Sequence, residues 1–312
     1  MQSRALEVSV LSVSVLAGLV FLLWPSEALA WGPLAHLNFS SGALEGLPSF
    51  GAATRIILSN FSSEFLYGSL AADIIVGKNL SPYAVHCHNW NVGFQVLDRA
   101  KGDPQKAFSL GFLAHLAADT VAHNYYVPYK TVQSFHSRVS GHAYWELRYD
   151  QKLSPHLWKL ARHVSQRAYR EHDDHLEEVL ANSHIIPFAV SKKMFGSLLL
   201  AARLKRWQRM SEVVAREREL LLTDEEVRDC ERLAIEQIVG MLKDGPKAEC
   251  TTADPTGGRN LHMASVLRKR LKKRTDLMPK QTEEAVRLAR PAFRNAIHGR
   301  LTLPELPDSP FW

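Results

Sequence analysis

The stretch His115-Leu-Ala-Ala-Asp119-Thr-Val-Ala-His123 places a side chain that can bind metal at every fourth residue. In an α-helix this spacing stacks the three side chains along one face over two turns. The intervening residues and the flanks at 108–114 and 125–127 are mostly small or apolar, which predicts a buried helix. A single buried histidine or hydrogen-bonded aspartate is common in protein cores, but three in register are unfavourable without partners or metal. We therefore predict that this helix carries a metal site.

Further metal-binding side chains lie on both sides of this helix. His142 and Glu146 repeat the spacing of four residues, and Asp73 is a charged residue inside the apolar run Leu-Ala-Ala-Asp-Ile-Ile. His86 and His88 both occur in Val-His-Cys-His-Asn-Trp, and the residues alone leave open which of them binds. Most of the later histidines have charged helical surroundings, so we expect them on the surface: His156, His163, His172, His175, His184, His262 and His298.

The first thirty residues have the form of a secretory signal peptide. Arg4 precedes an apolar run over about 8–24, and Ala-Leu-Ala at 28–30 directly precedes Trp31. An uncleaved membrane anchor is the alternative, but the run is short for a span and ends in a processing site. We expect an exported protein, periplasmic or extracellular, that begins at Trp31. The new amine and the carbonyl of Trp31 are then candidate metal ligands five residues ahead of His36, although Trp31 is alternatively an ordinary core residue.

Size and charge set broad limits. Without the leader the chain keeps 282 of its 312 residues, enough for one large domain, although two are possible. The leader holds one arginine and two glutamates, so its removal changes the formal net charge from +6 to +7. A basic protein suits anionic substrates, but phospholipids and nucleic acids are both anionic, so charge does not choose between them.

The three cysteines leave two questions open. An exported protein can pair Cys230 with Cys250 in a disulfide, but spacing alone does not fix the geometry. Cys87 lies between two histidines, and we interpret it as a packed thiol rather than a zinc ligand.

The pattern of apolar residues is helical throughout, and no segment alternates convincingly with a period of two. The sequence therefore predicts an all-α fold, a multi-helix bundle with the metal site between core helices. We predict one helical domain over 31–243. Helices are expected at 38–47, 52–67, 92–100, 104–126, 139–151, 155–180, 189–219 and 223–243.

The segment 244–312 is predicted to pack on the same domain. Its first part, 244–260, is rich in glycine and proline and suits a linker or an active-site loop. The strongly basic run 266–274 suits docking on an anionic membrane surface, with a solvated helix end as the alternative. The last residues, from 303 on, contain three prolines and are expected to be extended.

Taken together, the metal-binding residues resemble those of the zinc-dependent phospholipase C family. The resemblance extends to the N-terminal domain of glycosylphosphatidylinositol-specific phospholipase D and, more distantly, to the zinc single-strand nucleases. It covers roughly the first half of the mature chain, and the second half is similar only in being helical. The residues that carry it are Trp31-Gly32 with His36, Asp73, His-Asn-Trp at 88–90, the helix with His115, Asp119 and His123, and His142 with Glu146.

The resemblance implies a helical bundle that binds three zinc ions. The first ion would take Asp73, His88, His115 and Asp119, and the second would share Asp119 and take His36 with the amine and carbonyl of Trp31. The third would take His123, His142 and Glu146, with positions open for water and substrate. The family pattern favours His88 over His86 as the ligand because an aromatic residue follows it closely. Asp73, Asp119 and Glu146 are the predicted catalytic residues.

The implied function is a secreted zinc-dependent phosphodiesterase that hydrolyses phospholipids. Zinc-activated hydroxide would attack phosphorus, with the third ion stabilising the departing oxygen. Glutamate at 146, where the nucleases tend to have aspartate, favours phospholipid over nucleic acid as the substrate. A zinc-dependent single-strand nuclease and a non-catalytic exported zinc-binding protein are the alternatives. The sequence leaves the oligomeric state open.

Overall fold

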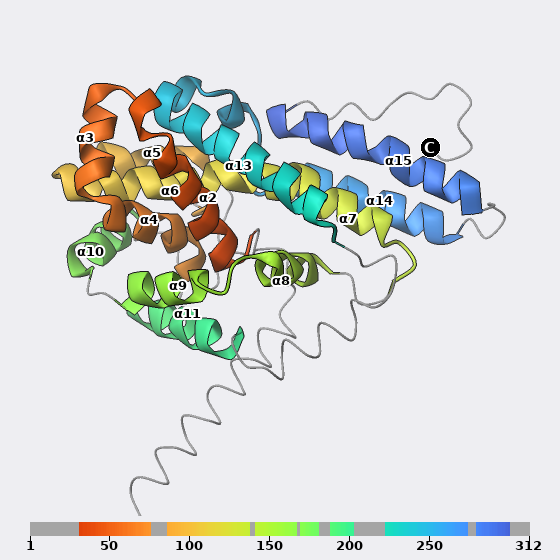
Figure 1. Ribbon diagram of the computed structural model, residues 1–312, viewed down its shortest axis with the longest axis horizontal. Coiled ribbons are helices and arrows are strands. Elements are labelled where there is room, and N and C mark those ends of the chain that lie inside the picture. Colours follow the sequence, from red (N-terminus) through yellow and green to blue (C-terminus); the bar gives the residue numbers. More distant parts are fainter. Residues whose placement is uncertain are drawn as a thin grey trace, which may run out of the picture.

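The computed structural model describes residues 31–75, 86–137, 141–166, 169–180, 188–202, 222–273 and 279–299 (Figure 1). Every secondary-structure element within these residues is a helix, which confirms the predicted all-α class. None of the described helices is both long and apolar enough to span a membrane. The predicted signal peptide lies outside the described residues. The helices are α2 (Pro33–Glu45), α3 (Ala52–Asn60), α4 (Ser62–Ile74), α5 (Trp90–Asp98), α6 (Asp103–Val121), α7 (Val127–Gln133), α8 (His142–Lys152), α9 (Leu157–Gln166), α10 (Arg170–Val179), α11 (Phe188–Ala202), α13 (Asp224–Asp244), α14 (Gly258–Lys273) and α15 (Pro279–Asn295).

Helix α6 is the central helix of the bundle. It begins with Asp103 and Pro104, an acidic residue and a proline that both favour the first turn of a helix. From Ala107 to Val121 nearly every side chain is buried, since α2, α4, α5 and α13 all pack against it. A helix that is apolar on all sides can be stable only at the centre of a bundle, so this sequence places α6 and its polar side chains in the core.

Helices α4 and α6 approach each other unusually closely. A Cβ atom added at Gly68 would lie 1.9 Å from the carbonyl oxygen of Phe108, and one at Gly111 would lie 2.0 Å from that of Phe65. Only glycine fits at both positions. The close crossing brings the last turn of α4, which carries Asp73, next to the second half of α6.

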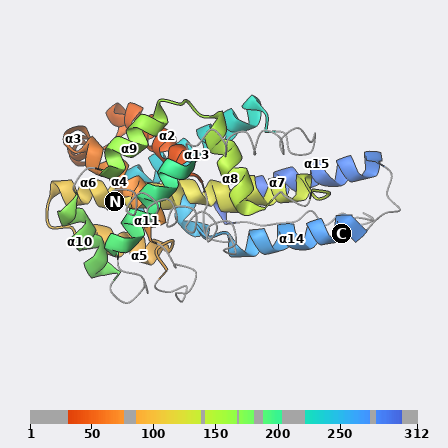
Figure 2. The ribbon, with the colours of Figure 1, turned by 90° about the horizontal axis from the view of Figure 1, so that it is seen from below.

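The second half of the chain completes and extends the bundle. Helix α13 begins with a capping box, in which the Thr223 hydroxyl accepts from the Glu226 amide and the Glu226 carboxylate accepts from the Thr223 amide. It packs along α6 and α2. Helices α14 and α15 pack on α7, and these three lie together at the end of the molecule opposite α10 (Figures 1 and 2).

Several predicted helices differ in their bounds. The segment 52–67 is not one helix, because Phe61 leaves the helical region (φ −127°, ψ 42°) and separates α3 from α4. Helix α3 buries only Leu58, whereas α4 packs into the core with most of its residues buried. The predicted helix 104–126 is α6 followed by a π-helical turn, Ala122–Tyr126, that continues into α7.

The segment 155–180 likewise contains two helices, α9 and α10, rather than one. Within the predicted helix 189–219, α11 accounts for the described part, and residues 203–221 lie outside it. The predicted loop 244–260 contains two short 3-10 helices, Gly245–Lys247 and Glu249–Thr252, before α14 begins. The proline-containing tail also lies outside the described residues.

Two later histidines are not on the surface as predicted. His172 stacks on Phe108 and Tyr169, and Nε2 of His175 donates to the carbonyl of Val96 at 2.8 Å. Both side chains are buried because α10 turns this face toward α5 and α6. Of the others, His156, His163 and His262 are exposed, His298 is partly exposed, and His184 lies outside the described residues.

No disulfide joins Cys230 and Cys250. Both are buried as thiols, and Sγ of Cys250 donates to the carbonyl of Gln237 instead.

Candidate metal centre

Five of the predicted ligands meet in the interior between α2, α4 and α6. His36 comes from α2, Asp73 from α4, His88 from the residues just before α5, and His115 and Asp119 from α6; none is more than 7% exposed. Nε2 of His88 lies 3.0 Å from Nε2 of His115 and 3.4 Å from Oδ1 of Asp73. The rings of His36 and His115 stack with their centroids 3.7 Å apart. These five side chains form the first cluster.

The carboxylate of Asp119 lies at the centre of the first cluster. Its Oδ1 is 3.4 Å from Nε2 of His36, and its Oδ2 is 3.3 Å from Nε2 of both His88 and His115. Both oxygens are fully buried, and neither accepts a hydrogen bond from the residues that the structure describes. Burial alone would raise the pKa of Asp119, but His115, His36 and His123 together lower it below its usual value. A buried anion with three imidazole nitrogens within 3.4 Å of its oxygens fits a place where cations bind.

The tautomer of His115 is fixed by helix α4. Its Nδ1 lies 2.9 Å from the carbonyl oxygen of Ser69, and a carbonyl can only accept, so Nδ1 carries the proton. In the neutral ring Nε2 then has no proton, and its lone pair can bind a metal. This nitrogen faces Asp73, His88 and Asp119. A backbone carbonyl behind a histidine is the usual support of a metal ligand.

The remaining three side-chain ligands form a second cluster. His123, on the π-helical turn, meets His142 and Glu146 on α8, and the possible ligand atoms of all three lie within 4.8 Å of one another. Nε2 of His142 is 2.9 Å from Oε1 of Glu146, as the spacing of four residues predicts. The rings of His123 and His142 lie edge to face with centroids 5.0 Å apart. Sequence and structure thus agree on which residues lie together here.

The predicted loop after α13 packs against the second cluster. Nδ1 of His123 donates to the carbonyl of Pro255, which leaves Nε2 of the neutral ring for a metal. Gly257 lies so close that an added Cβ would be 2.4 Å from Cβ of His123, and its φ of +57° also favours glycine. The segment 244–260 therefore helps to orient a predicted ligand.

Trp31 has a buried side chain beside the first cluster. Its ring stacks on Tyr126 and contacts Phe39 and Tyr149, and its Nε1 donates to the carbonyl of Ala118 at 3.0 Å. The indole is thus a core residue, which is compatible with a ligand role for its amine and carbonyl. Ala118 directly precedes Asp119, so this bond places Trp31 near the first cluster.

Sequence reasoning missed Asp150 as a residue of the site. Asp150 continues the spacing of four residues beyond His142 and Glu146, and its two oxygens accept from the amides of Leu34 and Ala35 at the start of α2. Burial, together with repulsion from Asp73, raises the pKa of Asp150 to about 7, against the pull of these two amides. Helix α8 therefore supports the second cluster and also holds the chain next to Trp31.

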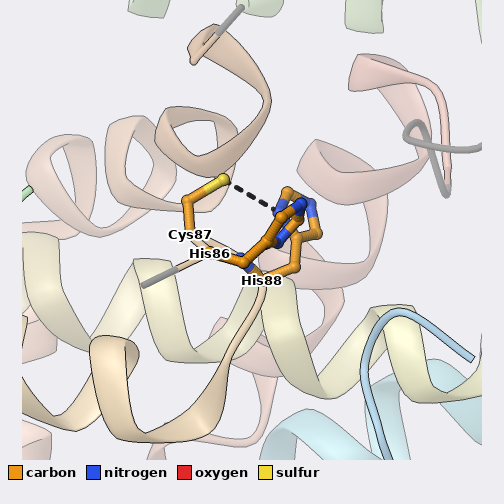
Figure 3. Close-up of side chains that lie close together, drawn as sticks. All are labelled: His86, Cys87 and His88. Carbon is orange, nitrogen blue, oxygen red and sulfur yellow. Dashed lines mark hydrogen bonds between the residues drawn. The ribbon is translucent and has the colours of Figure 1, made fainter. Parts of the chain in front are cut away.

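The segment 86–88 brings three possible ligands together (Figure 3). Only His88 reaches the first cluster through Nε2. Nδ1 of His86 accepts from the amide of His88 at 3.0 Å, and Sγ of Cys87 lies 3.2 Å from Nδ1 of His88. The geometry favours His88 over His86 as the ligand in the first cluster.

Comparison with known proteins agrees with this geometry. Residues 35–188 match the family described as zinc-dependent phospholipase C. These residues belong to the zinc-dependent phospholipase C family. The matched range is about half of the chain, and it contains every predicted ligand except Trp31. The family is zinc-dependent, and the nitrogen and oxygen donors of both clusters fit zinc.

The chain is also similar to an uncharacterized protein of Archaeoglobus fulgidus. The two are 34% identical over 130 residues, which are 39% of this chain and 32% of that protein. The match thus spans about a third of the relative's length. No solved structure matches the chain.

Proposed function

We propose that the protein is an exported zinc-dependent phosphodiesterase that hydrolyses phospholipids in the manner of phospholipase C. The observation that carries this proposal is the Asp119 carboxylate, with one oxygen toward His36 and the other toward His88 and His115. A carboxylate with donors on both sides suits a bridge between two metal ions. Two metal ions about 3.5–4 Å apart are typical of enzymes that cleave phosphodiesters.

The clusters supply the parts that such a reaction needs. Zinc bound there would lower the pKa of coordinated water and neutralise the charge of a phosphodiester. The histidines present neutral nitrogens as ligands, and the carboxylates of Asp73, Asp119 and Glu146 balance the charge of the cations. The Asp73 side chain is 3% exposed and the Asp119 side chain is fully buried, so of these two carboxylates only Asp73 keeps any exposed area. We propose that Asp73 accepts the proton that water releases as its oxygen bonds to phosphorus. The bond from phosphorus to the departing oxygen breaks in the same reaction.

The number of ions follows from the two clusters. We propose three zinc ions, two on either side of Asp119 and one held by His123, His142 and Glu146. Asp119→Asn removes the shared carboxylate charge, so we expect loss of activity and fewer zinc ions per chain by elemental analysis. The matched control is Asp103→Asn, an exposed aspartate in the first turn of the same helix. Full activity in Asp119→Asn would count against the proposed arrangement.

The substrate class is tested directly. The purified protein would be assayed on phosphatidylcholine, phosphatidylinositol and single-stranded DNA under identical zinc concentrations. We expect release of a phosphorylated head group from phospholipid and no cleavage of DNA. Turnover of DNA alone would favour the nuclease, whereas bound zinc with no hydrolysis of any substrate would favour a non-catalytic zinc protein.

The amino terminus of the mature protein is part of the proposal. N-terminal sequencing of the exported protein is expected to begin at Trp31. A variant that keeps Met-Ala in front of Trp31 should bind less zinc and lose activity, because its α-amine is no longer at the cluster. Normal activity in the extended variant would exclude the Trp31 amine as a ligand.

We also propose that the basic run 266–274 docks on an anionic membrane surface. Its described part lies on α14, where Lys269, Arg270, Lys272 and Lys273 are all exposed, while Leu267 and Leu271 pack inward; Arg274 lies outside the described residues. Reversing Lys272 and Lys273 to glutamate should weaken binding to vesicles that contain phosphatidylserine. The control reverses Lys101 and Lys106, which are exposed near the start of α6. Equal binding by both double variants would refute docking through α14.

A further inference from the structure

We propose that Cys87 is a positioning residue whose thiol sets the tautomer and the ring orientation of His88. The inference rests on the proposed function only in taking His88 as a zinc ligand. Sγ of Cys87 lies 3.2 Å from Nδ1 of His88 (Figure 3). The same sulfur lies 3.6 Å from the carbonyl oxygen of Ala72, and the Cys87 side chain is buried.

The two contacts of the thiol determine where the protons lie. A carbonyl oxygen can only accept, so the S–H group donates to Ala72, and the lone pairs of the sulfur remain as acceptors. Nδ1 of His88 must then be the donor in the second contact. In the neutral ring this leaves Nε2 without a proton, and Nε2 is the atom that faces Asp73, His115 and Asp119.

The same thiol joins two segments that supply ligands. Ala72 directly precedes Asp73 on α4, and Cys87 directly precedes His88 before α5. A hydrogen-bonded chain from the His88 ring through the sulfur to the Ala72 carbonyl therefore fixes one ligand relative to the other. Metal-binding histidines usually have a carboxylate or a carbonyl behind them, as His115 has Ser69, and loss of that partner lowers metal affinity.

His86 has a different and complementary place. Its Nδ1 accepts from the amide of His88, so in the neutral ring the proton is on Nε2. His86 thus holds the backbone of His88 while Cys87 holds its side chain. If instead the sulfur itself bound metal together with these histidines, Cys87 would be a ligand and the proposal would be wrong.

The test compares three variants of the purified protein, Cys87→Ala, Cys87→Ser and Cys250→Ala. Serine keeps one donor and an acceptor, and Cys250 is a matched control because it is also buried and donates to a backbone carbonyl. In chelator competition we expect Cys87→Ala to bind zinc about 10- to 100-fold more weakly. Cys87→Ser should recover most of this loss, and Cys250→Ala should bind as the unsubstituted protein does. Equal zinc affinity in all of them would overturn the proposal.

Two measurements on the unsubstituted protein complete the test, and neither depends on the variants folding. Nitrogen-15 NMR of labelled histidine should show His88 with its proton on Nδ1, and the opposite tautomer would refute the inference. The cobalt-substituted protein should lack sulfur-to-cobalt charge-transfer absorption, whose presence would make Cys87 a ligand. These readouts do not use phosphodiester hydrolysis, so an inactive protein would contradict the proposed function without affecting this result.

Discussion

Gly111→Ala tests whether the close contact between α4 and α6 positions the metal site. The added Cβ would lie 2.0 Å from the carbonyl oxygen of Phe65, whereas ordinary contacts begin at 3.4 Å. The missing 1.4 Å must come from movement of the two helices, because the obstructing atoms are backbone and cannot rotate away. Asp73 lies on α4 and both His115 and Asp119 lie on α6, so the movement separates the ligands.

The expected effects follow from these distances. Metal–ligand distances tolerate about 0.2 Å, so a shift of this size should remove most of the zinc bound by the first cluster. Overpacking of a core costs about 1–3 kcal/mol, and we expect a value near 3 because backbone faces backbone. For a domain of this size, this corresponds to a fall in melting temperature of roughly 6–12 °C in the metal-free protein.

Gly240→Ala is the matched control. Gly240 lies inside α13 with nothing within 4 Å of an added Cβ, so the usual helix preference for alanine should raise stability by about 0.5–1 kcal/mol. Thermal unfolding followed by circular dichroism and elemental analysis of zinc would compare the two variants. If Gly111→Ala melts and binds zinc like Gly240→Ala, the close crossing does not position the site.

Three further predictions concern stability. Lys130 is fully buried and its Nζ is 2.7 Å from Glu226, so Lys130→Ala should cost about 3 kcal/mol in urea unfolding by removing the cation beside that carboxylate. This is the low end for a buried pair, because Glu226 is partly exposed and keeps its hydrogen bond from the Thr223 amide. The pKa of Asp150 is about 7 in the folded protein, against an ordinary value of 3.8. Between these pH values the native state therefore binds more protons than the unfolded state, and the metal-free protein loses stability as pH rises from 4 to 7. Asp150→Asn should lack this loss of up to about 4 kcal/mol, and parallel stability curves over this pH range for the two proteins would contradict the assignment. Removal of zinc by a chelator should lower the melting temperature of the unsubstituted protein, and addition of zinc should restore it, as calorimetry would show.

The helical class and most of the site follow from simple spacing. Side chains that can bind metal stand at every fourth residue in apolar surroundings, at His115, Asp119 and His123. This pattern predicts a buried helix with its donors on one face. The same rule places His142 beside Glu146. It also extends to Asp150, which was overlooked because its role is a contact with α2 that no local pattern reveals.

The errors have physical causes as well. Phe61 separates two helices without glycine or proline, and the difference between them is one of packing, since α3 buries only Leu58 whereas α4 buries most of its residues. The π-helical turn that contains His123 could not be predicted from the amino-acid composition. It adds one residue to a helical turn, and its side chains are equally suited to an α-helix. His172 and His175 lie in a charged helix, and only the packing of α10 against α5 and α6 decides that they are buried.

The origin of the donors in separate helices has a consequence for how the protein folds. His36, Asp73 and Asp119 come from α2, α4 and α6, so no single helix contains the first cluster. An ion finds its ligands only after these helices have associated, and its binding free energy is added to the native state alone. Interactions that are absent from the folding transition state slow unfolding without accelerating folding. Zinc supply should therefore prolong the lifetime of the folded chain while leaving its rate of formation unchanged.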